Sequence, residues 1–393
     1  MQLSDTSTPA VATGVKRTTR ALGGAILGAA LALPGVAPPV HAEGAPESGV
    51  IGVRYLNYRD WQPGFDRIQV SAPSAYFLVP IAGSWSVSGS GVMDTVSGAS
   101  PRWHSSISSA SHLADFRRAG DLRVTRYESR SSYSLGVAGS TEHDYLSKAV
   151  SGQATFSSDD NNTTLAVGFG RAWDVVNPVN EVVSYQHKST SDMLLGVTQT
   201  LTSNDILQVN VTYAMSRGYL NDPYKLVDQR PNERNQAALL LRWNHYFDGP
   251  GTTLRLAHRF YSDTYGVRSN TSTVEYVMPG AGGWTFTPLL RYYSQSAANF
   301  YYDPVYDPTL GAPYPPGYGN NPTALASADA RLSAFGAATV GARIAKDFDE
   351  TWTADMRVEY YQQKSSWRLF GTGSPGLAPL SAIFVQTGVS KRF

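Results

Sequence analysis

The closing stretch of the chain, Pro379 to Phe393 with the sequence PLSAIFVQTGVSKRF, decides the fold. Alternate residues counted back from the last one form a mostly apolar face: Phe393, Lys391, Val389, Thr387, Val385 and Ile383. The residues between them form a polar face: Arg392, Ser390, Gly388 and Gln386. Because the side chains of a β-strand alternate between two faces, this pattern predicts a strand with one apolar and one polar side. Lys391 departs from the apolar face but does not break the alternation.

The N-terminal segment has the parts of an export signal. It contains a basic region, an apolar run and a small-residue cleavage site, which are Lys16, Arg17 and Arg20, then Ala21 to Leu33, then Val40 to Ala42. The apolar run is shorter than the roughly 20 residues of a membrane-spanning helix. We therefore expect residues 1–42 to be a signal peptide and residues 43–393 to be the mature protein. A terminal strand that ends in Phe behind such a signal resembles the closing strand of bacterial outer-membrane β-barrels.

The composition favours a barrel over the rival classes, a soluble β-sandwich or a propeller. Only 16% of the residues are charged, as expected of a barrel with an uncharged lipid face and a lumen lined by small polar groups. The chain has no cysteine, which excludes disulfides, thiolate metal sites and a covalently attached c-type haem, so we expect no cofactor. The net charge of +1 gives no reason to expect a nucleic-acid partner.

Alternation recurs along the chain and predicts further strands. It is clearest at Leu207 to Met215 and at Trp352 to Tyr361, where apolar and polar residues alternate strictly. From this parity we expect Val209, Val211, Met356 and Val358 to face lipid. The other segments are Gly49 to Tyr58, Arg67 to Val79, Trp85 to Val96, Arg126 to Gly139, Leu146 to Phe156, Thr164 to Trp173, Asp192 to Thr202, Gln236 to Phe247, Thr252 to Ser262, Thr271 to Met278, Trp284 to Gln295 and Arg331 to Ala345.

The strand count and the loop lengths give the expected architecture. With the terminal strand the segments number 15, whereas single-chain bacterial barrels usually have an even number of strands. We expect a closed antiparallel transmembrane β-barrel of 14 strands, or of 16 if residues 121–139 form two. Short connections rich in turn formers alternate with longer ones in the second half of the chain, which predicts short periplasmic turns and long extracellular loops. This alternation would place the link 97–122 in the periplasm unless the strand count before it is off by one.

Several sequences at the loop edges carry a family resemblance. They are Ser97 to Pro101 after Asp94, Ser140 to Tyr145, Asn161 to Thr164, Gly218 to Lys225 (GYLNDPYK), Arg230 to Arg234 (RPNER) and Arg291 to Tyr301 (RYYSQSAANFY). In number and order they resemble the bacterial family catalogued as domain of unknown function 3570, over nearly the whole mature chain. The resemblance implies an outer-membrane barrel. It supplies no activity and no catalytic residues.

Charged residues at lumen-facing parity form the candidate site. If Leu254, Leu256 and Phe260 face lipid, Arg255 and Arg259 face the lumen, and the same argument applies to the neighbouring strands. The lumen-facing candidates are Arg242, Arg255, Arg259, Arg291, Arg343, Asp355, Arg357 and Glu359, with Arg331 and Glu275 as further ones. Such a wall would concentrate anions in a pore. Alternatively, its arginines and carboxylates would brace the barrel as ion pairs.

The sequence also contains residues that could serve hydrolysis or calcium binding. The hydrolase candidates are His104, His112, His143, Ser105, Asp115, Glu142 and Asp144. A nucleophile needs a base and an orienting third group, and solvated loop residues explain this set more simply. The Pro- and Tyr-rich loop from Ser296 to Asp329 would form either a surface cap or an inward constriction, and its Asp303 and Asp307 make a poor Ca²⁺ site. Trp243, Trp284, Tyr292 and Trp352 suit interfacial girdles.

These observations favour a non-catalytic channel or transport-type barrel for a small solute in the outer membrane of a Gram-negative-type bacterium. The alternative is a scaffold barrel that docks a periplasmic or extracellular partner, for example a redox protein. A barrel-embedded hydrolase comes third. The expected partners are outer-membrane lipid, the barrel assembly machinery during insertion and, for the scaffold alternative, an exported protein. The sequence leaves the solute and the oligomeric state open.

Overall fold

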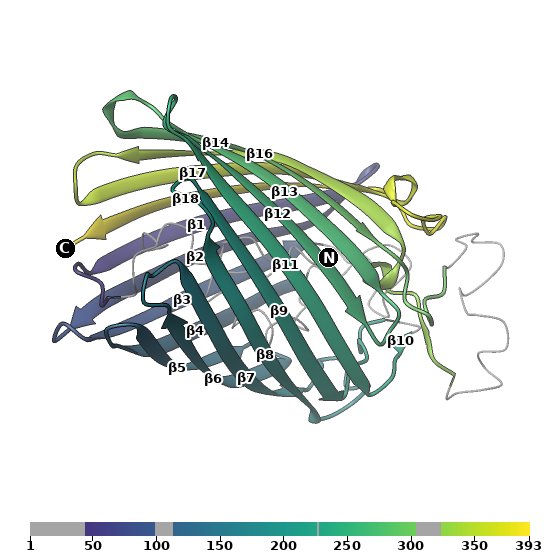
Figure 1. Ribbon diagram of the computed structural model, residues 1–393. Helices are drawn as coiled ribbons and strands as arrows, with labels where there is room; N and C mark the ends of the chain where they lie inside the picture. The colour runs from purple at the N-terminus through teal and green to yellow at the C-terminus, as the bar shows by residue number, and fades with distance from the viewer. Residues whose placement is uncertain (1–43, 99–112, 226–227, 304–323) are drawn as a thin grey trace.

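The computed structural model describes residues 44–98, 113–225, 228–303 and 324–393. Within these residues, sixteen antiparallel strands close into one barrel, with each strand paired to its neighbours in the chain (Figure 1). The strands are β1 (Val50–Gln62), β2 (Phe65–Ile81), β3 (Trp85–Gly98), β4 (Leu113–Tyr127), β5 (Ser131–Thr141), β6 (Tyr145–Ser157), β7 (Thr163–Val176), β8 (Gln186–Thr200), β9 (Asp205–Gly218), β11 (Glu233–Phe247), β12 (Thr252–Asp263), β13 (Arg268–Pro279), β14 (Trp284–Gln295), β16 (Phe335–Asp347), β17 (Trp352–Lys364) and β18 (Leu380–Arg392). The predicted closed antiparallel barrel is confirmed. The predicted signal peptide, residues 1–42, lies outside the described residues.

The barrel has the higher of the two expected strand counts. Residues 121–139 belong to two strands, β4 and β5, joined by a short turn at residues 128–130. The favoured count of 14 therefore becomes 16. The link after β3 was expected on the periplasmic side unless the strand count before it was off by one. Because β3 ends at Gly98 and β4 begins at Leu113, this link joins the two strands at the end of the barrel opposite Val50 and Arg392. The strand missing from the sequence interpretation was β4.

The terminal strand closes the barrel as predicted. β18 pairs antiparallel with β1 from Val50 opposite Arg392 to Trp61 opposite Ser381. The backbone N–H of Gly49 donates to the carbonyl oxygen of Phe393 at 2.7 Å, and the N–H of Phe393 donates back at 2.9 Å. Closure leaves no unpaired strand edge, which lipid could not satisfy.

Burial alternates along the strands as a barrel wall requires. On β1, Ile51, Val53 and Tyr55 are exposed, whereas Arg54 and Leu56 are only 7% and 1% exposed. The exposed residues face outward, because the inward residues, such as Leu56, pack against inward residues of the neighbouring strands β2 and β18. The outer face is apolar over most of the wall, so it suits lipid. Among the described residues no helix has the length and apolarity to cross a membrane.

The two ends of the barrel differ. At one end of the barrel, β1 begins at Val50 and β18 ends at Arg392. We call this end the turn end, because its connections are short, for example residues 82–84 and 248–251. The other end, the loop end, carries the longer connections 219–232, 296–334 and 365–379 (Figure 1). Outward-facing Trp243, Trp284 and Trp352 lie near the turn end, as interfacial residues do.

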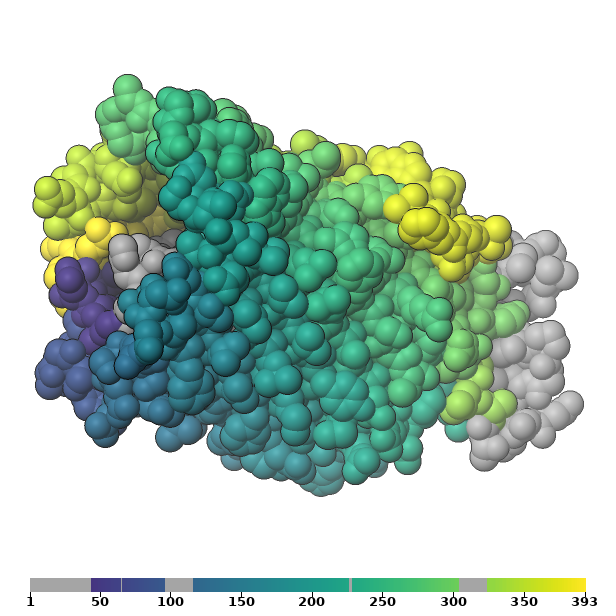
Figure 2. Space-filling model, viewed as in Figure 1, coloured from purple at the N-terminus to yellow at the C-terminus, as the bar shows by residue number. Residues whose placement is uncertain are grey.

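Loops at the loop end pack on one another to form a cap. β10 (Asp228–Gln229) in one loop pairs with β15 (Ala326–Ser327) in another. Two apolar clusters join the cap to the lumen wall, one containing Leu220, Tyr261, Tyr265, Val267, Ala298 and Leu332, the other Phe335, Ala337 and Leu377. Since Tyr261 and Ala337 point into the lumen, the loops fold inward over this part of the rim. Figure 2 shows residues 365–379, in yellow, projecting from the wall at this end.

Candidate functional site

A belt of charged side chains lines the lumen in the middle of β1, β11 to β14, β16 and β17. We call it the lumen belt, and it consists of Arg54, Arg242, Arg255, Arg259, Glu275, Arg291, Arg343, Asp355, Arg357 and Glu359. The strand period of two places each of these residues on the inner face, with apolar neighbours such as Leu241, Phe260, Leu290 and Met356 exposed on the outer face. All eight lumen candidates of the sequence analysis belong to this belt.

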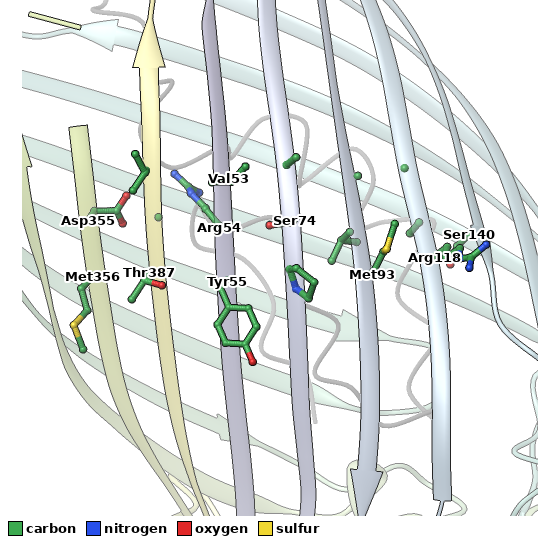
Figure 3. Close-up of a pocket in the computed structure, with 18 of the residues that line it drawn as sticks. Val53, Arg54, Tyr55, Ser74, Met93, Arg118, Ser140, Asp355, Met356 and Thr387 are labelled. Carbon is green, nitrogen blue, oxygen red and sulfur yellow. The ribbon is translucent and has the colours of Figure 1, made fainter. Parts of the chain in front are cut away.

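One part of the belt bridges the seam of the barrel. Arg343 Nε donates to Asp355 Oδ2 at 3.2 Å. Arg54, on the other side of β18, points toward the same carboxylate (Figure 3). Gly388 lies between them, and a Cβ there would be 3.0 Å from Arg54 Cγ and 3.2 Å from Asp355 Oδ1. The missing side chain of Gly388 therefore lets these two groups approach across the terminal strand.

A second part of the belt crosses from β17 to β12. Arg357 Nε donates to Glu359 Oε1, and Arg291 Nη1 lies 3.6 Å from Glu359 Oε2. Arg255 Nη1 lies 3.9 Å from Glu275 Oε2 and keeps 50% of its side chain exposed, although it faces inward. The lumen beside Arg255 is thus open to solvent, as it is beside Thr212 of β9.

The belt has fewer carboxylates than arginines, three against seven. Glu359 serves two arginines, and Asp355 lies between Arg343 and Arg54. Arg242 donates to the neutral side chain of Gln208 at 3.2 Å, and the Arg259 guanidinium lies 5.7 Å from the centre of the Tyr261 ring. The belt therefore contains bracing ion pairs and also has an excess of positive charge.

Arg331 is a correction to the predicted lumen wall. It was expected on a strand from Arg331 to Ala345, but β16 begins at Phe335 and Arg331 lies in a short 3-10 helix, η4 (Ala330–Leu332), of the cap. There Arg331 Nη2 contacts Asp222 Oδ2 at 2.6 Å and Arg331 Nε contacts Asp329 Oδ1 at 2.8 Å.

The remainder of this cap network is buried. Arg230 bridges Asp228 at 2.8 Å and Asp329 at 2.7 Å, and their side chains are at most 3% exposed. Burial alone would raise the pKa of Asp329, but the Arg331 and Arg230 guanidiniums hold that pKa well below its usual value of 3.8. These ion pairs tie the loops 219–232 and 324–334 together. Sequence reasoning missed the network, because Asp222 and Arg331 are 109 residues apart.

The hydrolase candidates form no catalytic arrangement within the described part of the chain. His104, Ser105 and His112 lie outside the described residues, and so does the side chain of Asp115. Asp144 accepts a hydrogen bond from Tyr224, and Glu142 lies 3.9 Å from Arg117 Nε, so both carboxylates bind loop-end side chains. The side chain of His143 is exposed to solvent.

A Ser–His contact that the sequence analysis missed lies on the outer wall. His258 Nδ1 is 2.9 Å from Ser272 Oγ, on the outer faces of β12 and β13. The other ring nitrogen, His258 Nε2, is buried and makes no hydrogen bond to the described residues. A serine nucleophile needs a histidine that a third group orients, so this pair lacks an essential part.

The described residues contain no cluster of acidic residues, histidine or cysteine that could hold a metal ion. Asp303 accepts a hydrogen bond from the backbone N–H of Gly376 at 2.9 Å and thus joins two loops of the cap. Asp307 and most of the Pro- and Tyr-rich loop lie outside the described residues.

Comparisons with known proteins agree with the fold. Residues 109–384 match the model of a family described as "Protein of unknown function (DUF3570)", which leaves β1 to β3 outside the matched region. None of the curated proteins matches the sequence. A solved bacterial polysaccharide outer membrane secretin is 8% identical, with 87% of this chain and 98% of that chain covered and a TM-score of 0.50.

Two further solved structures are more distant in shape. The CymD monoaromatic hydrocarbon channel is 10% identical over 88% of this chain and 89% of its own, with a TM-score of 0.41. The outer membrane protein opdK from Pseudomonas aeruginosa is 10% identical over 88% of this chain and 99% of its own, with a TM-score of 0.42. At these identities the likeness to the secretin shows the outer-membrane barrel fold alone.

Proposed function

The chain belongs to the DUF3570 family, whose description assigns no activity, and we propose that it is a non-catalytic channel for small anionic solutes in the outer membrane of a Gram-negative-type bacterium. The turn end would face the periplasm and the capped loop end the exterior, as is usual for such barrels. Outer-membrane lipid and the barrel assembly machinery would be its partners.

The excess positive charge of the lumen belt is the observation that carries this proposal. The belt contains seven arginines and three carboxylates, Arg255 keeps half of its side chain exposed to the lumen, and Arg242 donates to the neutral side chain of Gln208. Charges of one sign inside a narrow, low-dielectric passage focus the field and raise the local concentration of counter-ions. The wall would therefore favour anions over cations during passage.

The alternatives have less support. A scaffold barrel would need a docking surface for an exported partner, for example a redox protein, and the cap supplies folded loops without showing what would bind them. A hydrolase would need a third group for His258, and the outer wall offers none among the described residues.

Single-channel recording in planar bilayers tests the proposal. The wild-type protein should conduct, and its reversal potential in a salt gradient should indicate anion preference. Replacing Arg255, Arg259 and Arg291 by Gln should shift the reversal potential toward cations, because Gln keeps hydrogen bonding but removes charge. The shift should shrink with salt, since the Debye length is about 30 Å at 0.01 M and about 3 Å at 1 M.

The matched control removes the same charge from the outer wall, with Arg118, Arg126 and Arg171 replaced by Gln. This variant should keep the wild-type reversal potential, because its changed side chains do not line the passage. A well-folded lumen variant with an unchanged reversal potential would end the anion proposal. A lumen variant that no longer folds would show that bracing is the main role of these arginines, and a wild-type barrel without conductance would favour the scaffold alternative.

A further inference from the structure

Three cations point outward from the lipid-facing wall near the loop end. They are Arg118 on β4, Lys148 on β6 and Arg171 on β7, and all three are exposed. The outward direction follows from the pairing, because each alternates with buried inward residues such as Arg117, Ser147 and Ala172. We call these three residues the outer cation cluster.

The cluster has no acidic counterpart on the outer wall. Among the outward-facing residues that the structure describes on β3 to β8, none is Asp or Glu. The contacts of the cluster are neutral: Arg118 lies 4.9 Å from the centre of the Phe116 ring, Arg171 lies 5.6 Å from the Trp173 ring, and Arg171 Nη1 donates to Ser191 Oγ at 3.1 Å. The positive charge of the cluster is therefore available to bind an anionic ligand.

The strand register brings the three cations together. Lys148 is directly opposite Trp173, and Arg171 is two residues from that position, so Lys148 and Arg171 are diagonal neighbours about 7 to 8 Å apart between Cα atoms. Gly120 and Gly139 lie in one row with Lys148 across β4, β5 and β6, and Arg118 is two residues from Gly120. Between Arg118 and Lys148, the outward residues of β5 are Gly139 and Thr141, so only the small side chain of Thr141 lies on the wall between them.

The cluster lies at one end of an apolar groove. A cavity of about 1240 Å³ follows a row of small outward residues, Ala354, Ala75, Gly91, Gly120 and Gly139, between larger ones such as Met93, Leu146 and Met356. Arg118 and Lys148 line the end of this groove on β4 to β6 (Figure 3 shows Arg118 and Met93). An apolar path that ends at exposed cations is complementary to an amphiphile with an anionic head and acyl chains.

We propose that the outer cation cluster binds the phosphate groups of a phosphorylated glycolipid of the outer leaflet, with an acyl chain of that lipid in the adjoining groove. Cations on a lipid-facing wall are costly unless they meet anions at the headgroup level. Phe116 and Trp173 beside the cluster are side chains typical of that level. The inference rests on the proposed outer-membrane location but not on conduction.

Native mass spectrometry of the lipid-free barrel in detergent tests the site. The probes are bisphosphorylated lipid A, the same glycolipid with its phosphates removed, and inorganic phosphate. The wild-type protein should retain lipid A, and the dephosphorylated form should bind at least about tenfold more weakly, because each charged hydrogen bond contributes about a factor of ten or more. The variant R118Q/K148Q/R171Q should lose affinity for lipid A by a similar factor.

Two variants serve as controls. R59Q/R217Q removes outward cations of the loop end that have carboxylate partners, Asp66 and Glu233, and should bind lipid A as the wild type does. R118K/R171K keeps the charge and should retain most of the affinity. If the triple variant does not fold, as judged by heat-modifiable gel migration, the single changes K148Q and R171Q decide instead.

Three results would overturn the proposal. They are equal lipid A affinity in the wild type and in the charge-removed variants, equal binding of the dephosphorylated glycolipid, and binding of inorganic phosphate as tight as that of lipid A. The last would indicate a site for a free anion. The conductance of R118Q/K148Q/R171Q tests the channel proposal independently of lipid binding, because this variant leaves the lumen belt unchanged.

Discussion

Gly388 is the residue on which the seam side of the lumen belt depends. It lies on the inner face of β18, and the space of its missing side chain is occupied by Arg54 and Asp355. Any larger residue must displace one of them, and Arg54 also lies 5.1 Å from the centre of the Tyr76 ring. Parity alone predicted Gly388 on a polar face, but it could not show that the absence of a Cβ matters there.

We expect Gly388→Val to destabilise the folded barrel by roughly 1 to 3 kcal/mol, the usual cost of overpacking. Urea unfolding in detergent, followed by tryptophan fluorescence, measures this change. The control is Gly91→Val, because a Cβ at Gly91 has no heavy atom closer than 4.0 Å, and a surface change of this kind usually stays within about 0.5 kcal/mol. Equal stability of the two variants would show that Arg54 and Asp355 move aside freely.

At the scale of elements, the sequence predicted most strands and missed β4 for a physical reason. β4 carries charges on both faces, with Arg117, Asp121 and Arg123 inward and Arg118 and Arg126 outward. The contrast between an apolar and a polar face, which identified β9 and β17, is therefore absent. The outward cations that hid the strand are partly those of the proposed lipid site, so the local departure from pattern coincides with a candidate function.

The cap was beyond prediction from sequence because its contacts join distant loops. Its central carboxylate gives a pH test with a definite sign. The folded pKa of Asp329 is depressed, so its contribution to stability is present above the unfolded value near 3.9 and is lost as the pH falls through the lower folded value. We expect the cap to stay ordered from pH 7 to about pH 4.

The variant Asp329→Asn should loosen the cap at neutral pH. Loss of a charged hydrogen bond costs about 1.5 to 3 kcal/mol, which corresponds to roughly 10- to 100-fold faster hydrogen exchange of residues 219–225 and 324–334. Hydrogen exchange with mass spectrometry measures the rates. Asp303→Asn, at an exposed loop contact with Gly376, should change those two segments little. Unchanged exchange in Asp329→Asn would mean that the apolar cluster around Leu332 suffices to hold the cap.

For the whole molecule, the alternation and the export signal predicted a transmembrane barrel, and the closed sixteen-strand wall confirms the fold. Alternation could not predict the contacts among the charged side chains in the lumen, because these depend on which inward side chains of different strands lie close together. Glu359 and Arg291 come from strands separated by β16, and Asp355 and Arg54 from strands separated by β18. Approaches of this kind, between residues on strands that are not paired with each other, decide how charge is distributed over the wall.

The charge of the lumen can be measured from within, since the chain has no cysteine of its own and one introduced thiol is unique. Thr212 is exposed on the lumen side of β9, and Val211 beside it is exposed on the outer side at the same depth. In membranes, Thr212→Cys should react with small charged thiol reagents, because water reaches it, whereas Val211→Cys should be protected by lipid. A positive lumen should make an anionic thiosulfonate react several-fold faster than a cationic one, relative to their rates with a free thiol, and salt should reduce the ratio. Equal reactivity of the two positions would contradict the assigned faces of β9. A ratio that favours the cationic reagent would contradict the positive lumen, whatever the barrel transports.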